Sequence, residues 1–243
     1  MIGILVELII SWILLYLIER KNILSLGFLP ISKRLKQLAI GFLITAILCI
    51  GVEFLEMLLR SSSLHLNEKA GTDLILSMFW WDFKSVLTEE LLFRGALLFI
   101  LIERIGARKG IIISAVAFGI YHWFSFGIFG NIIPMFFVFI GTGLMGCAWA
   151  LAFSKTKSIF LPLGLHLGWN FTFNTIFSKG PLRNGLLISE GGNIISDWFS
   201  LIGLWGVPII VLLIVKYWVT KENTELTGEK VKTTATLYRR NEG

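Results

Sequence analysis

Charged side chains at helical spacing interrupt one apolar segment of this sequence. They are Glu89, Glu90 and Arg94, and because Glu90 and Arg94 are four residues apart, they share one face of a helix. A charged side chain in the middle of a membrane helix costs about 2.5–3.5 kcal/mol. These residues must therefore face a protein interior or a water-filled cavity that offsets the cost, and such a cluster indicates a functional site.

Two further polar pairs with the same spacing follow. Phe118 and His122 are four residues apart in one apolar segment, and His166 and Asn170 are four residues apart in a later one. A carboxylate beside two histidines can hold and deprotonate a water molecule, and an amide with a histidine can donate hydrogen bonds to a developing oxyanion. No serine or cysteine is placed like a nucleophile, so this set predicts hydrolysis by an activated water molecule. Taken singly, each residue has a structural alternative, as a packing histidine, an interhelical asparagine or an ion pair.

The composition predicts that membrane-spanning helices position these residues. Of the 243 residues, 55% are hydrophobic and only 16% are charged, and the mean hydropathy is +0.77. A soluble domain usually has about 25% charged residues. We therefore expect an all-α, polytopic bundle of seven to eight transmembrane helices, forming one domain over residues 1–220 with its motifs in residues 86–177.

Apolar segments of suitable length predict seven crossings of the membrane. They are residues 1–18, 37–59, 86–102, 111–126, 132–154, 158–177 and 197–219. Residues 73–85 are amphipathic and aromatic, which predicts a helix in the membrane interface before the third crossing. Glu53 and Glu56, near the end of the second crossing, indicate carboxylates at the interface or at the rim of a cavity.

The distribution of basic residues predicts the orientation. Loops 19–36, 103–110 and 154–157 hold 5, 3 and 2 Lys or Arg residues, whereas loops 60–72, 127–131 and 178–193 hold 2, 0 and 2. The positive-inside rule therefore predicts an external amino terminus and a cytoplasmic carboxyl terminus. We expect the protein in the plasma membrane, with residues 221–243 as a polar, disordered cytoplasmic tail.

The helix rise allows the depths of the three candidate residues to be compared. At about 1.5 Å per residue from the cytoplasmic helix ends, Glu89 lies at about 20 Å, His122 at about 17 Å and His166 at about 12 Å. Helix tilt can absorb differences of this size. The three side chains are therefore expected to meet in one layer of the membrane.

Together the three motifs resemble those of the CPBP intramembrane protease family, which includes the type II CAAX prenyl proteases and the bacterial Abi group linked to bacteriocin processing and self-immunity. The motifs occur in the family's order, on separate predicted crossings, within residues 86–177. They are Glu89-Glu90-x-x-x-Arg94, Phe118-x-x-x-His122 and His166-x-x-x-Asn170.

The resemblance implies an intramembrane endopeptidase and gives each residue a role. By resemblance, Glu89 activates the water molecule with the help of His122, and His166 and Asn170 support the oxyanion. The supporting residues, which hold the geometry of the site, are Glu90, Arg94 and Phe118. The alternative from another class is a non-hydrolytic membrane protein, either a proton-coupled transporter or an inactive immunity scaffold. A transporter commonly contains an internal repeat, which this sequence lacks.

The expected partners are the lipid bilayer and a membrane-associated peptide or protein substrate. A processed peptide or leader is favoured over a prenylated protein. The net charge of +6 does not indicate a nucleic-acid partner, because the basic residues lie in loops beside membrane crossings. No pattern in the sequence indicates a particular oligomeric state.

Two histidines and a carboxylate are also a familiar set of zinc ligands. The soluble zinc motif places its histidines four residues apart on one helix, whereas His122 and His166 are 44 residues apart. Glu90, the carboxylate available to orient a zinc-bound histidine, is paired with Arg94 by helical spacing. We therefore expect a metal-free site without a cofactor, with zinc bound by Glu89, His122 and His166 as the alternative.

Overall fold

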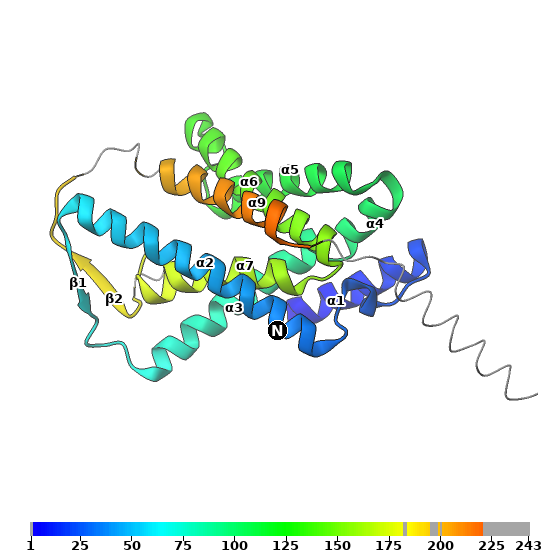
Figure 1. Cartoon of the computed structure of the whole chain (residues 1–243), viewed down its shortest axis with the longest axis horizontal. Coiled ribbons are helices and arrows are strands. Elements are labelled where there is room, and N and C mark those ends of the chain that lie inside the picture. The colour runs from blue at the N-terminus through cyan, green and yellow to red at the C-terminus, as the bar shows by residue number, and fades with distance from the viewer. Residues whose placement is uncertain (1, 182–183, 195–198, 200, 221–243) are drawn as a thin grey trace, which may run out of the picture.

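The computed structural model describes residues 2–181, 184–194, 199 and 201–220. Over these residues the chain forms a bundle of α-helices with one short two-stranded sheet (Figure 1). The α-helices are α1 (Ile2–Leu14), α2 (Ile31–Arg60), α3 (Thr72–Arg94), α4 (Ala96–Ile105), α5 (Ala107–Ser125), α6 (Ile132–Thr156), α7 (Phe160–Phe171) and α9 (Val207–Trp218). This arrangement confirms the predicted all-α bundle. The predicted tail over residues 221–243 lies outside the described residues, and the domain boundary at residue 220 stays a prediction.

Short segments of other helical types extend some of these helices. The π-helical segments are η1 (Leu15–Glu19), η3 (Thr172–Ile176) and η4 (Ile202–Gly206), and η2 (Ile23–Leu26) is a 3-10 helix. Since η3 directly follows α7, the two form one rod that ends near residue 176. Isolated π-helical turns within α-helices are frequent at functional sites.

Three described helical segments are long and apolar enough to cross a membrane. They are Ile2–Glu19, Ile23–Arg60 and Ile132–Thr156, and Gly203–Trp218 is a shorter apolar helix. Large hydrophobic side chains are exposed along them, which suits a surface in contact with lipid chains. The protein is therefore an integral membrane protein. The number of seven crossings stays a prediction, because the other helices are shorter or less apolar.

The third predicted crossing is wrong in its boundaries. Residues 73–85 and the charged motif form one continuous helix, α3, which ends at Arg94. Gly95 then turns the chain, and α4 begins at Ala96. A Cβ atom at Gly95 would overlap the carbonyl oxygen of Leu91, so the turn needs glycine. Hydrophobicity could not reveal the break, because the segment is apolar on both sides of it.

The loops after α2 and after η3 meet in the two-stranded sheet, at the left of Figure 1. β1 (Ser63–Leu66) pairs antiparallel with β2 (Leu187–Glu190), so that Ser63 lies opposite Glu190. The orientation prediction assigns both loops to one side of the membrane, and their pairing agrees with it. The sheet itself was not predicted.

Glycines allow α7 to pack closely on its neighbour α2. A Cβ atom at Gly164 or Gly168 would overlap backbone carbonyl oxygens of α2, at Leu38 and Phe42 respectively. Small residues at helix interfaces permit such close backbone contact in membranes. His166 lies two residues from each glycine, which is about 200° around the helix, so it faces away from α2.

Candidate active site

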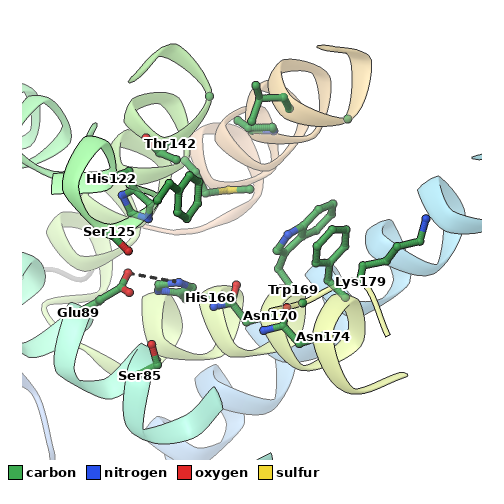
Figure 2. Close-up of a pocket in the computed structure, with 18 of the residues that line it drawn as sticks. Ser85, Glu89, His122, Ser125, Thr142, His166, Trp169, Asn170, Asn174 and Lys179 are labelled. Atoms are coloured by element: carbon green, nitrogen blue, oxygen red, sulfur yellow. Dashed lines mark ion pairs between the residues drawn. The ribbon is translucent and has the colours of Figure 1, made fainter. Parts of the chain in front are cut away.

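The three motifs converge on one cavity of about 920 Å³ within the bundle (Figure 2). Glu89 reaches it from α3, His122 from α5, and His166 and Asn170 from α7. The structure therefore brings together the four residues that the sequence predicts to be catalytic, from three separate helices. The expectation that these side chains meet is confirmed by this placement, whereas their depth in the membrane and their catalytic roles stay predictions.

Glu89 presents an unpaired carboxylate oxygen at this cavity. Its Oε2 atom lies 3.8 Å from Nε2 of His166 (Figure 2). The same oxygen is buried and has no hydrogen-bond partner among the described residues. An ionised carboxylate only accepts hydrogen bonds, so Glu89 can take one from a bound water molecule beside the histidine.

His166 is held by Glu90 on the side away from Glu89. Its Nδ1 atom lies 2.8 Å from Oε1 of Glu90. The same oxygen accepts a hydrogen bond from Nη2 of Arg94 at 2.6 Å, and Oε2 of Glu90 accepts one from Nε of Arg94 at 2.9 Å. Glu90 and Arg94 are fully buried, so the two form an ion pair shielded from water. Because the paired carboxylate can only accept, Nδ1 carries the hydrogen and Nε2 is left to face Glu89.

This contact corrects one step of the argument against a metal. The ion pair with Arg94 was expected to leave Glu90 unable to accept a hydrogen bond from a histidine. One carboxylate has acceptor sites for both partners, and Glu90 accepts from Arg94 and from His166. Glu90 therefore orients His166 while it neutralises Arg94. In the described part of the chain, no group of three His, Cys, Asp or Glu side chains has an arrangement suited to a metal ion.

His122 is oriented by its own helix. Its Nδ1 atom lies 2.8 Å from the backbone oxygen of Phe118, one turn earlier in α5. A carbonyl oxygen can only accept, so Nδ1 donates, and Nε2 of the neutral ring is an acceptor available to a water molecule. The four-residue spacing of the Phe118–His122 motif thus matches one turn of helix and fixes the tautomer.

Aromatic rings complete the support of the site. Phe118 is almost fully buried, with its ring 4.4 Å from that of His122 and 4.3 Å from the guanidinium carbon of Arg94. Trp149 of α6 stacks on His166 at 3.9 Å and also lies under Arg94 at 4.9 Å. Cations are attracted to the faces of aromatic rings, so both rings stabilise the buried arginine. Trp149 was missed in the sequence, where nothing separates it from other tryptophans of apolar segments.

Asn170 lies one turn after His166 and lines the same cavity (Figure 2). It is half-buried, and its side chain makes no hydrogen bond to any described residue. Its amide is therefore free to donate to a substrate oxygen. Ser85 of α3 lines the cavity as well.

One end of the cavity carries a cluster of charges. Lys179 lies 3.4 Å from Glu53 and 3.0 Å from Glu56, and all three residues line the cavity. Of the two places predicted for these glutamates, the membrane interface or the rim of a cavity, their position in the cavity lining favours the second. Lys179 was missed, because a lysine in a polar loop carries no signal of its own.

A second missed group lies around Asp82, two turns before Glu89 in α3. Asp82 of α3 is fully buried and bonded to Asn174 and Thr175 of η3. It could have been found, because Asp82 precedes Glu89 by seven residues, or two turns, within an apolar and aromatic segment. The prediction of an interfacial helix assigned this residue to the membrane surface.

A comparison with family models matched residues 71–172 to the family described as Type II CAAX prenyl endopeptidase Rce1-like. The matched range runs from the residue before α3 to the first residue of η3, so it contains every helix that carries a predicted catalytic residue. Searches of curated proteins and of solved structures found no match. The family match confirms the resemblance on which the predicted activity rests. Residues 71–172 of this chain are thus similar to the Rce1-like family of type II CAAX prenyl endopeptidases, a family of proteases.

Proposed function

We propose that this protein is an intramembrane endopeptidase that uses Glu89 to activate a water molecule. The observation that carries the proposal is the unpaired Oε2 atom of Glu89, which lies 3.8 Å from Nε2 of His166 in the cavity that His122 also lines. A buried carboxylate without a partner is costly. A water molecule or substrate that uses this oxygen as an acceptor would offset the cost.

In the proposed reaction, the water molecule lies between Glu89 and Nε2 of His122. Glu89 takes a proton from the water as its oxygen attacks the carbonyl carbon of the scissile peptide bond. The amide of Asn170 donates a hydrogen bond to the resulting oxyanion, and His166, when doubly protonated, donates another from Nε2 while Glu90 accepts from Nδ1. Glu89 then gives the proton to the leaving nitrogen as the carbon–nitrogen bond breaks, which releases an amine and a carboxylic acid.

The supporting residues act through positioning. Glu90 fixes the ring of His166 by its bond to Nδ1, and Arg94 holds Glu90 from the other side. Phe118 supports His122 through its backbone oxygen and supports Arg94 through its ring. These contacts keep the reacting groups in place before a substrate binds, so that little reorganisation is needed during the reaction.

The proposed substrate is a peptide or protein that lies in the same membrane. Aromatic side chains, among them Trp81, Trp169 and Phe173, line the cavity, and they suit the apolar side chains of a membrane-associated segment. The CAAX substrates named in the family description and a leader peptide both satisfy this requirement. We place the enzyme in the plasma membrane with its carboxyl terminus in the cytoplasm, on the basis of the loop charges.

The test compares the membrane-associated peptides of cells that make the active protein with those of cells that make Glu89→Gln. Mass spectrometry should find cleavage products that appear only with the active protein. Glu190→Gln is the matched control, since Glu190 is exposed on β2 and outside the cavity. Identical peptides in the two populations, at equal protein levels, would contradict the proposed activity.

A further inference from the structure

The reaction proposed above makes no use of Asp82, although this carboxylate is completely buried in α3. Asn174 donates from Nδ2 to its Oδ1 atom at 2.6 Å, and Thr175 donates from Oγ1 to its Oδ2 atom at 2.9 Å. Removing a carboxylate from water costs several kcal/mol, and well-aligned hydrogen bonds are needed to offset it. Because both hydrogen-bond partners of this buried acid lie on η3, the contact holds η3 against α3.

Asp82 forms the far end of a set of polar contacts between α3 and the rod of α7 and η3. Seven residues separate Asp82 from Glu89, so the two side chains point within about 20° of one another. On the opposite rod, His166 and Asn174 are eight residues apart. Glu89 lies 3.8 Å from His166 at one end, and Asp82 lies 2.6 Å from Asn174 at the other.

Asn170 lies midway between these two contacts. It is four residues from His166 and four from Asn174, and all three line the cavity (Figure 2). Ser85 of α3, three residues from Asp82, lines the cavity on the opposite side. The position of Asn170 along and around its helix is therefore fixed from both ends.

The contact of Asp82 with Asn174 and Thr175 is needed because η3 is not an α-helix. Its closing hydrogen bond runs from the backbone N–H of Phe177 to the oxygen of Thr172, five residues earlier. A π-helical turn is wider than an α-helical one, so the α-helix alone does not determine where Asn174 points. Gly180 limits Asn174 from the other side, because a Cβ atom at Gly180 would overlap the amide of Asn174.

We propose that Asp82 is a positioning residue, which acts through Asn174 and Thr175 to set the place of the Asn170 amide at the oxyanion. This inference rests on the proposed function, in which Asn170 donates to the oxyanion. Loss of the Asp82 contact lets the rod rotate or shift by a fraction of a turn. The amide then misses the oxyanion, which forms only in the transition state, so kcat falls and KM changes little.

The experiment is a double-mutant cycle on purified full-length protein, with a peptide substrate found by the mass-spectrometric comparison. Asp82→Asn, which keeps the shape of the side chain, should lower kcat by about 10- to 100-fold in the native background. In the Asn170→Ala background the same substitution should cause no further loss, because the group it positions is gone. A purely structural contact would lower kcat by the same factor in both backgrounds.

Threonine variants supply the control and a second way to weaken the contact of Asp82 with η3. Thr175→Val removes only one of the two donors and should lower kcat, whereas Thr175→Ser keeps the hydroxyl and should restore it. Thr156→Val removes a similar buried hydroxyl, which bonds to the backbone at Ala152 outside the cavity, and should leave kcat unchanged. If Asp82→Asn does not accumulate in the membrane, Thr175→Val takes its place in the cycle.

The outcomes separate this inference from the proposed function. Equal loss from Asp82→Asn with and without Asn170, or no loss at all, overturns the positioning role while Glu89→Gln stays inactive. Activity retained in Glu89→Gln overturns the proposed function instead. A drop in kcat that disappears in the Asn170→Ala background supports the role proposed for Asp82.

Discussion

At the scale of residues, Glu90 decides which atom of His166 reaches the cavity. Its carboxylate accepts from Nδ1 of His166 and from Arg94 at the same time, and both acids of the motif thereby touch the same imidazole, from opposite sides. Helical spacing predicted the Glu90–Arg94 pair. It could not predict the third partner, because the contact between Glu90 and His166 joins residues 76 positions apart in the chain.

The three histidines of the chain provide an internally controlled test. His122→Ala and His166→Ala should each abolish cleavage, because each removes a group at the proposed water or oxyanion position. Asn170→Ala should lower kcat by about 10²- to 10³-fold, the usual loss for an oxyanion donor. His65→Ala is the control, since His65 is exposed on β1 and outside the cavity. The measurement is the initial rate of peptide cleavage by the four purified variants. Full activity in His166→Ala would contradict the catalytic role assigned to His166.

Metal removal tests whether Glu89, His122 and His166 act without a bound metal ion. Protein treated with a strong chelator and checked for residual metal should keep its cleavage rate, because the proposed chemistry needs only Glu89 and the histidines. The measurement is the initial rate before and after treatment. Loss of activity that stoichiometric zinc restores would make Glu89, His122 and His166 zinc ligands instead.

At the scale of elements, the glycines of α7 place its histidine. Gly164 and Gly168 contact the backbone of α2, and His166 therefore points to the opposite side, towards the cavity. The sequence predicted this helix and its polar pair. It did not show which neighbour the glycines would face, because close packing depends on how the helices associate.

Gly164→Ala should separate α7 from α2 and destabilise the protein by about 1–3 kcal/mol, the usual cost of overpacking. Its added Cβ atom would overlap the backbone at Leu38. Gly51→Ala is the matched control, because nothing described lies within 4 Å of a Cβ atom at that position on α2. Thermal unfolding in detergent should show a lower midpoint for Gly164→Ala alone. Equal midpoints would contradict the close contact.

Element boundaries show where hydrophobicity ceases to predict structure. The apolar segments around the helices were visible in the sequence, but the break at Gly95 and the sheet of β1 and β2 were not. A single glycine changes the mean hydropathy of a segment very little. The two strands are more than 120 residues apart in the chain, as Ser63 and Glu190 illustrate. Each has 4 residues, the shortest length at which alternation indicates a strand.

At the scale of the whole molecule, the orientation in the membrane follows from the loop charges. A reporter fused after Gly243 should respond as cytoplasmic, and one inserted near Asn67 should respond as external. Asn67 lies beside the sheet and bonds to the chain at Leu186, so its loop and the loop after η3 share one side. Paired reporters in living cells measure this directly. Finding both on the same side of the membrane would contradict the orientation and the depth assigned to the site.

Single-turnover kinetics with purified protein test most directly whether Glu89 activates the water molecule in this cavity. Glu89→Gln keeps the shape of the side chain and removes only its ability to take a proton. The variant should bind the peptide substrate as tightly as the native protein, while cleavage slows by about 10²- to 10⁴-fold, the contribution of a positioned general base. Cleavage by Glu89→Gln at the native rate, with equal substrate binding, would contradict the account.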